Sequence, residues 1–253
     1  MTRRPPVPLA TAATVGVVLL LLPLAGILVH APWRHLPSLL TSSTALTALR
    51  LSLECSLGAL AVSILVGVPL AWVLARTDFP GKSLVRSLVT VPLVLPPVVG
   101  GVALLLAFGR RGIVHLPLAF TTWGAIAAEA FVAMPFLVLA VEGAIASLDS
   151  RFEDVAATLG TGPLETFRRV TIPLVGPGLA AGAALAWARA LGEFGATITF
   201  AGNLPGKTQT LPLLVYQALQ TDPDTAIALS LLLLVLSLAV LVALRGRWRL
   251  SRP

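Results

Sequence analysis

Charged residues are scarce in this sequence. Asp, Glu, Lys and Arg make up only 11% of the 253 residues, whereas hydrophobic residues make up 57%. A soluble domain carries about 25% charged residues, so this chain has too little charge to cover a water-facing surface. The shortage excludes soluble enzymes and soluble DNA-binding domains, and it points to a membrane protein with several spans.

Cysteine and histidine are also nearly absent. Cys55 is the single cysteine, so neither a disulfide within the chain nor a cysteine metal cluster can form. The three histidines lack the i, i+4 spacing and the acidic neighbour of a helical metal site; they are His30, His35 and His115. No Ser–His–Asp or Cys–His arrangement stands out. We therefore predict no metal site, no cofactor and no catalytic residue in this chain.

Two Gly-Lys-Ser/Thr triplets, at 81–83 and 206–208, resemble the end of a phosphate-binding P-loop. Such a loop needs another glycine five residues before the glycine of the triplet. Those positions hold Arg76 and Ala201. By this criterion the chain has no nucleotide-binding site of its own.

Long apolar runs dominate the sequence, whose mean hydropathy is +0.93. A helix needs about 20 apolar residues to cross the hydrocarbon core of a bilayer. Six segments have this length: Leu9–Val29, Leu46–Ala75, Leu84–Phe108, Thr122–Val141, Leu174–Phe200 and Ala226–Leu244. The first is interpreted as a retained span, since it is longer than the apolar part of a signal peptide. We predict an all-α polytopic protein of the cell membrane with six transmembrane helices.

The basic residues flank these segments instead of gathering on one face. With the N-terminus inside, 12 of the 18 Lys and Arg residues fall on the cytoplasmic side, 4 on the outer side and 2 within spans. This distribution follows the positive-inside rule. We therefore predict that both termini are cytoplasmic, with a basic tail at 245–253. The net charge of +7 needs no nucleic-acid partner to explain it.

Prolines interrupt the third segment. Pro92, Pro96 and Pro97 each lack the amide hydrogen that an α-helix uses, so the segment must be kinked or broken. Broken backbone at membrane depth is tolerated where protein or a water-filled cavity satisfies it. The prolines therefore either shape the packing of the bundle or mark a helix that lines a pathway.

Small residues recur every four positions at the start of the fifth segment, at Gly178, Gly182, Ala186 and Ala190. Such a stripe lets a second helix approach closely. We expect the partner to be a helix of the same chain rather than one of a second copy.

Four ionisable residues inside the spans form two pairs at helical spacing. Arg50 and Glu54 are four residues apart, as are Arg189 and Glu193, so each pair shares a helix face and can neutralise itself. They are either fixed structural ion pairs, or Arg189 leaves Glu193 for an anionic substrate during transport. Glu129 has no partner nearby in the sequence, and its pairing with Arg50 or Arg189 is left open.

The longest polar segment, 142–173, joins the fourth and fifth spans on the predicted cytoplasmic side. Ser150 and Glu153 have the spacing of a capping box and predict a helix start, and Gly160 predicts its end. The helix carries one apolar stripe, made of Phe152, Val155, Ala156 and Leu159. A helix lying on lipid prefers Lys and Arg on its polar face, whereas this one carries Glu153 and Asp154. We therefore favour a docking helix for a cytoplasmic partner.

At this loop the chain resembles the permease subunits of ABC importers. Their signature is Glu-Ala-Ala, three residues, Gly, nine residues and Ile-x-Leu-Pro, and every spacing is kept here. The matching positions are Asp154, Val155, Ala156, Gly160, Val170, Ile172 and Pro173. Asp replaces Glu, Val replaces the first Ala and the Ile, and Ile replaces Leu. The acidic charge and the glycine are retained.

Other segments resemble the molybdate-type members of that family. They are residues 79–83, 91–99, 108–112, 190–203 and 205–212. The resemblance extends over about residues 44–244, which it implies to be the transmembrane domain, after a first helix and outer loop in residues 1–43. Sulfate-type permeases share parts of these motifs.

The resemblance implies a homodimer of permeases in the lipid bilayer, two cytoplasmic ABC ATPase subunits and an external oxyanion-binding protein. ATP hydrolysis would belong to the ATPase, so this chain is expected to be non-catalytic. The residues expected to couple to the ATPase are Glu153, Asp154, Val155, Ala156, Leu159 and Gly160. The residues expected along the pathway are Pro96, Pro97, Glu193, Thr197, Thr199 and Asn203.

The sequence thus indicates the permease subunit of an ATP-driven importer that moves molybdate by alternating access. Permeases of the same class for tungstate, sulfate or another oxyanion are alternatives, and a transporter driven by an ion gradient is an alternative of a different class. The docking helix distinguishes the two classes. A gradient-driven carrier needs no such helix, and its intramembrane charges would have to relay protons.

Overall fold

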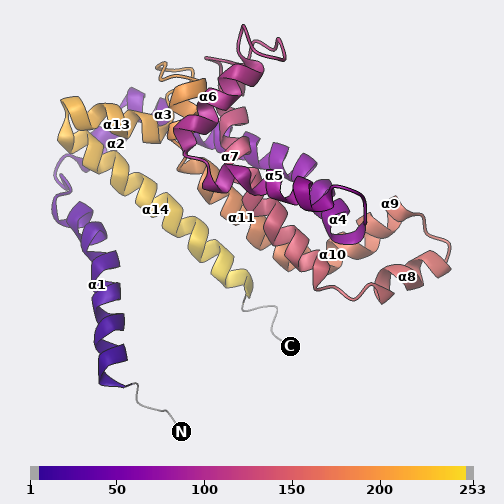
Figure 1. Cartoon of the computed structure of the whole chain (residues 1–253). Coiled ribbons are helices and arrows are strands. Elements are labelled where there is room, and N and C mark those ends of the chain that lie inside the picture. The colour runs from indigo at the N-terminus through magenta and orange to yellow at the C-terminus, as the bar shows by residue number, and fades with distance from the viewer. Residues whose placement is uncertain (1–5, 249–253) are drawn as a thin grey trace.

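A computed structural model describes residues 6–248, and all regular structure within this range is helical (Figure 1). Two short segments, η1 and η2, are π-helical. The elements are α1 Val7–Val29, α2 Leu36–Leu40, α3 Ser43–Val62, η1 Ser63–Gly67, α4 Val68–Arg76, α5 Lys82–Val94, α6 Pro97–Phe108, α7 Thr122–Ala146, α8 Arg151–Thr158, α9 Pro163–Thr166, η2 Phe167–Thr171, α10 Ile172–Leu174, α11 Gly176–Leu191, α12 Gly195–Phe200, α13 Leu211–Thr221 and α14 Pro223–Trp248.

Within residues 6–248, four helical stretches are long and apolar enough to cross a bilayer. They are Val7–Val29, Ser43–Arg76, Thr122–Ala146 and Pro223–Val240. The pair Pro163–Leu174 and Gly176–Leu191, bent by 79°, makes a fifth when it is taken as one span. The all-α membrane fold is confirmed. The count of six crossings and the cytoplasmic position of both termini stay predictions, as does the basic tail, whose residues 249–253 lie outside the described range.

The hydrophobic core is built around α7, which packs against α3, α4 and α11. Leu137 and Val141 of α7 are fully buried in this core, as is Leu74 near the end of α4. A central helix with neighbours on several sides reads as apolar over most of its surface. This explains why α7 gives a strong span signal without a distinct polar face.

The small-residue stripe of α11 faces α7. A Cβ atom added at Gly178 would lie 2.5 Å from the Cβ of Ala144, and one added at Gly182 would lie 2.8 Å from the Cβ of Ala140. The two helix backbones therefore approach more closely than larger side chains would allow. The prediction of packing within the chain is confirmed.

Replacing a small residue of this stripe by a larger one should destabilise the helix bundle. We expect Gly182→Val to lower the free energy of unfolding by about 1–3 kcal/mol, because α7 leaves no room for the added methyl groups. Gly143→Ala, on α7 itself, is the control: its new Cβ meets nothing within 4 Å. Thermal unfolding of the purified protein in detergent measures both variants, and equal midpoints would contradict the packing argument.

Two of the predicted spans are broken, and the helices that follow the two breaks, α6 and α12, pack on each other. The third span divides into α5 and α6 at Leu95–Pro96, which confirms the break predicted from its prolines. The fifth divides into α11 and α12 at 192–194, a break that was not predicted. A Cβ at Gly101 of α6 would lie 2.6 Å from that of Thr199 of α12, so these two helices are in close contact.

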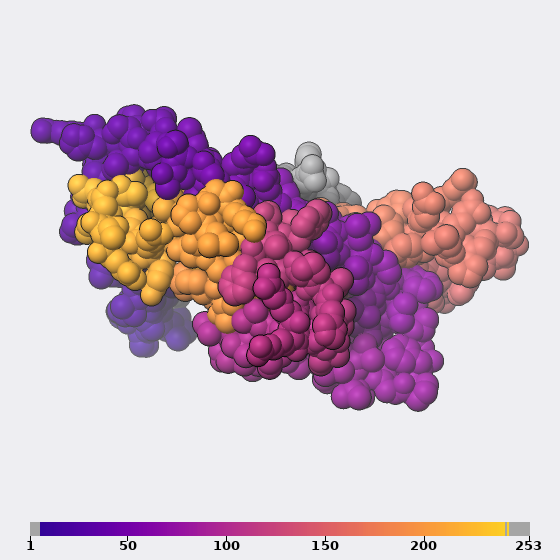
Figure 2. Space-filling model, turned by 90° about the horizontal axis from the view of Figure 1, so that it is seen from above, coloured from indigo at the N-terminus to yellow at the C-terminus, as the bar shows by residue number. Residues whose placement is uncertain are grey.

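Helix α1 and the α8–α9 loop lie at opposite sides of the molecule (Figure 1). None of the residues of α1 is buried. Figure 2 shows the segment containing α8 and α9 as a lobe that projects from the helical body. Both parts of the chain therefore have surface available to other molecules.

Candidate functional site

The projecting helix α8 exposes most of its apolar stripe. Phe152, Val155 and Leu159 are 54%, 58% and 80% exposed, whereas Ala156 is buried against the neighbouring loop. Thr161 stabilises that contact, since its hydroxyl donates to the carbonyl oxygen of Ala156 at 2.7 Å. Three large apolar side chains on one face of a projecting helix form a partner-binding surface more readily than a water-facing one.

The predicted capping box at the start of α8 is wrong. Ser150 has helical backbone angles, with φ −62° and ψ −19°, and its side chain caps no amide. The carboxylate of Glu153 turns to the body instead, where Arg76 Nε lies 2.6 Å from Oε2 and Thr171 donates its hydroxyl to Oε1. A charged partner competes successfully for a carboxylate that would otherwise cap its own helix. Asp154, the next residue, is exposed.

Gly160 ends the helix as predicted. Its φ of +87° lies in the left-handed region that L side chains rarely adopt. Of the residues predicted to couple to an ATPase, Asp154, Val155, Leu159 and Gly160 are on the surface, whereas Glu153 and Ala156 face the body. The set therefore divides into an outward and an inward group.

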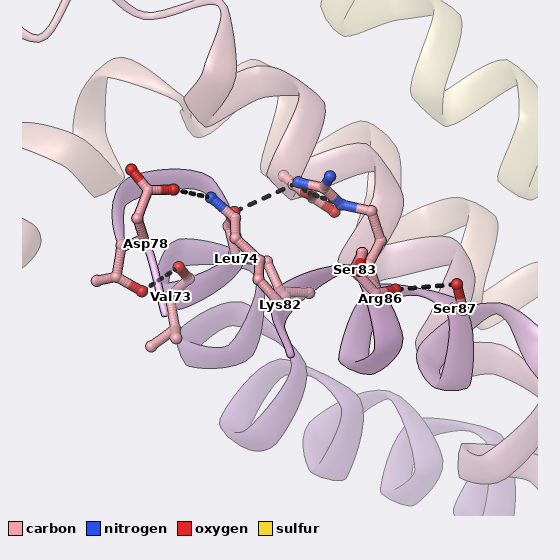
Figure 3. Close-up of polar contacts among 9 residues, drawn as sticks. Val73, Leu74, Asp78, Lys82, Ser83, Arg86 and Ser87 are labelled. Atoms are coloured by element: carbon pink, nitrogen blue, oxygen red, sulfur yellow. Dashed lines mark hydrogen bonds and ion pairs between the residues drawn. The ribbon is translucent and has the colours of Figure 1, made fainter. Parts of the chain in front are cut away.

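A second group of polar contacts joins α4, α5 and α7 beside this loop (Figure 3). Arg86 of α5 donates from Nε to Glu142 Oε1 at 2.8 Å and from Nη2 to the carbonyl oxygen of Leu74 at 3.4 Å. Lys82 and Asp78 form an ion pair of 3.0 Å nearby. The sequence did not predict that Arg76 and Arg86 make these contacts, because both were interpreted only as positive charges that flank the spans.

Glu193 lies where the fifth span is broken. Its Oε1 accepts a hydrogen bond from the backbone amide of Ala196 at 2.8 Å, so it caps the short helix α12. Its Oε2 lies 2.6 Å from Arg189 Nη1, and the two side chains are 1% and 28% exposed. Pro97 is in contact here too, since a Cβ at Gly195 would lie 2.8 Å from its Cβ. The breaks in spans three and five therefore meet.

The other predicted pathway residues differ in their surroundings. Thr197 is fully buried on α12, and its hydroxyl has no partner among the described residues. Thr199 donates to the carbonyl oxygen of Gly195 in its own helix at 2.8 Å. Asn203 lies beyond α12, where its Nδ2 is 3.4 Å from Gln217 Oε1. The structure thus brings Pro97 and Glu193 to the place where the two breaks meet, and Thr199 lies against α6 at Gly101. Pro96 directly precedes α6, Thr197 lies within α12, and Asn203 lies in the loop that follows.

Arg50 pairs with Glu54 and Arg189 pairs with Glu193, whereas their position within the membrane stays a prediction. Arg50 Nε lies 2.6 Å from Glu54 Oε1, and these side chains are 79% and 46% exposed on the surface of the chain. With both arginines so occupied, Glu129 of α7 forms no ion pair with the side chains that the structure describes, those of residues 6–240 and 242. It is buried, and its Oε2 has no hydrogen-bond partner in the same range.

The loop after α6 borders a cavity of about 590 Å³ on the predicted outer side. Two cations line it, Arg110 from this loop and Lys207 from the loop before α13. Thr122 holds the two loops together, since its hydroxyl donates to the carbonyl oxygen of Lys207 at 2.9 Å. Phe120, also in the lining, has a φ of +60°, which is rare for an aromatic residue.

The fold and the sequence family together define the class of protein. A chain of a bacterial alginate ABC transporter has the same fold, with a TM-score of 0.73 at 17% identity over 93% of this chain and 92% of that one. At this identity the likeness shows a shared fold, and the class of protein follows from the sequence family. Residues 63–248 match the family described as binding-protein-dependent transport system inner membrane component, and the chain belongs to this family of multi-pass cell-membrane proteins.

Two relatives resemble the chain over most of its length. The molybdenum transport system permease protein ModB of Mycobacterium tuberculosis is 44% identical over 242 residues, which are 93% of this chain and 92% of the relative. The protein of the same name from Escherichia coli K12 is 41% identical over 215 residues, which are 81% of this chain and 94% of that one.

Proposed function

We propose that this chain is the permease subunit through which an ATP-driven importer moves molybdate across the cell membrane. The observation that carries the proposal is the identity of 44% and 41% to two molybdenum transport permeases, over almost their whole lengths. The exposed helix α8 and the paired helix breaks supply the parts that such a subunit needs, namely a surface for the ATPase and an interrupted pathway.

The outward residues of α8 are the proposed contact with the ATPase. Val155 and Leu159 present apolar surface, and Asp154 adds a charge beside them. Gly160 lets the chain turn back immediately after the helix. ATP binding would bring two such helices together and open the pathway outward, and hydrolysis would reset it. The hydrolytic step belongs to the ATPase subunit, so this chain is a non-catalytic partner in it.

The pathway is proposed to run beside the contact between α6 and α12. Broken helices near the middle of a membrane protein offer free backbone groups to a polar solute. At Glu193 the carboxylate is held by Arg189 and by the amide of Ala196. These contacts keep the break ordered during transport. Helix α5 can then change its angle to α6, and α11 its angle to α12.

A homodimer accounts for the apolar surface that the single chain leaves uncovered. Helix α1 is unburied throughout. Exposed valines and leucines also run along α5 and α6, among them Leu84, Leu88, Val91, Val98 and Val102. Lipid can cover part of this surface, and a second copy placed against α5 and α6 would enclose the pathway between two chains.

The cavity on the predicted outer side is where an external oxyanion-binding protein would release its cargo. Arg110 and Lys207 give this mouth a positive potential, which raises the local concentration of an anion. Selectivity would lie with the external protein, since the described residues around the pathway carry no comparable basic cage.

Uptake of labelled molybdate and labelled sulfate into cells lacking this chain, with and without its restoration, tests the proposal. We expect restoration of molybdate uptake, loss of that uptake on ATP depletion and its persistence when the proton gradient is collapsed. Restored sulfate uptake alone would change the cargo to sulfate. Uptake that follows the proton gradient, or recovery of neither anion, would refute the proposed function.

A further inference from the structure

The last turn of α4 is joined to the projecting loop by Arg76. Its Nε lies 2.6 Å from Glu153 Oε2, and the two side chains are only 16% and 15% exposed. Its Nη2 donates to the carbonyl oxygen of Leu148 at 3.0 Å. The other oxygen of Glu153 accepts from the fully buried hydroxyl of Thr171. One carboxylate on the inward face of α8 is therefore held by two elements of the body.

The same turn of α4 is joined to α5 by Arg86 (Figure 3). Arg86 donates to the carbonyl oxygen of Leu74, two residues before Arg76. The last four carbonyls of a helix have no partner within the helix, and the helix dipole favours a cation beside them. Glu142 of α7 lies largely buried under the same guanidinium and neutralises it. The end of α4 thus receives one arginine contact from α5 and offers its own arginine to α8.

We propose that Arg76 and Arg86 are positioning residues that transmit a movement of α8 to α5 through the last turn of α4. This inference rests on the proposed function, in which an ATPase moves α8. It assigns different roles to adjacent residues: Glu153 holds α8 to the body, and Asp154 faces the partner. Because α5 ends at the break before Pro96, its movement changes its angle to α6 while the contact between α6 and α12 is kept.

A double-mutant cycle on the reconstituted complex tests this link, since a chain of contacts alone does not demonstrate coupling. The complex comprises the permease, its ATPase subunits and the external binding protein in proteoliposomes. The variants are Arg76→Gln, Arg86→Gln and the double variant. Lys82→Gln is the matched control, because it breaks the exposed ion pair with Asp78 in the same corner of the fold. The quantity measured is molybdate taken up per ATP hydrolysed.

We expect each arginine variant to lower this ratio by about threefold or more, with the double variant no lower than the worse single one. Lys82→Gln should keep the wild-type ratio, and the ATPase subunits should co-purify with every variant. An unchanged ratio in either arginine variant, losses that multiply in the double variant, or an equal loss in Lys82→Gln would overturn the inference.

Glu153→Gln covers the case in which Arg76→Gln fails to assemble. The amide oxygen can still accept from Thr171, so this variant removes the ion pair and keeps the local hydrogen bond. A wild-type ratio in Glu153→Gln would then refute the link. Failure of the proposed function and failure of the arginine link can be distinguished. Absence of molybdate uptake by the wild-type complex contradicts the proposed cargo, whereas the arginine link is judged from variants of an active complex.

Discussion

A complex carrying Gly160→Val should retain less than about a tenth of wild-type uptake, a loss that corresponds to about 1.4 kcal/mol. Gly160 has a φ of +87°, and a β-branched residue in that conformation is strained by about 1–2 kcal/mol. The chain would relieve the strain by unwinding the end of α8. Leu159, the most exposed residue of the apolar stripe, would then leave its place on the proposed ATPase surface.

Gly81 provides a control of nearly identical backbone geometry. It has a φ of +86°, and like Gly160 it has no atom within 4 Å of an added Cβ. Gly81→Val therefore introduces the same strain in a loop that lies outside the proposed ATPase surface. Uptake and co-purification of the ATPase subunits are measured for both variants at equal amounts of inserted permease. Equal losses of ATPase co-purification in the two variants would assign the effect to general strain and remove the argument for α8 as the docking helix.

Glu193→Ala should be among the most destabilising single substitutions in the bundle. It leaves the largely buried Arg189 without a counter-charge and leaves the amide of Ala196 without an acceptor. Removing one partner of a buried ion pair costs about 3–5 kcal/mol. We expect the thermal midpoint of the purified protein in detergent to fall by roughly 10 °C, together with loss of uptake.

The pair of Arg50 and Glu54 has the same spacing in an exposed setting and serves as the control. Glu54→Ala should shift the midpoint little, since Arg50 can extend its side chain toward the membrane surface. Glu193→Gln should fall between wild type and Glu193→Ala, because its amide oxygen still caps α12 while the charge is gone. Similar midpoints for Glu193→Ala and Glu54→Ala would contradict the structural importance of the buried pair.

The features that the sequence predicted correctly depend on local rules. Helix breakage follows from proline itself, so the separation of α5 from α6 was predictable from Pro96 and Pro97. The stop of α8 at Gly160 follows from the conformational freedom of glycine. The close packing of α11 follows from the spacing of its small residues, although the identity of its partner, α7, does not.

The features that were missed depend on residues far apart in the chain. The capping box failed because Arg76, from a different span, pairs with the carboxylate that would have made it. No spacing rule connects residues 76 and 153. The break before α12 was missed for a related reason: the peptide at 192–194 is stabilised by Glu193 and by contact with α6, neither of which a periodic pattern can reveal.

Because of the π-helical segment η1, the effect of deleting one residue from the second span depends on where the deletion lies. A π turn accommodates one residue more than an α turn, so deletion of a single residue from Ser63–Gly67 can restore a regular helix with both flanks in register. The same deletion in α4 rotates everything before it by about 100° relative to Arg76. Residues 63–67 are thus the place where this span can shorten while Arg76 still points at Glu153.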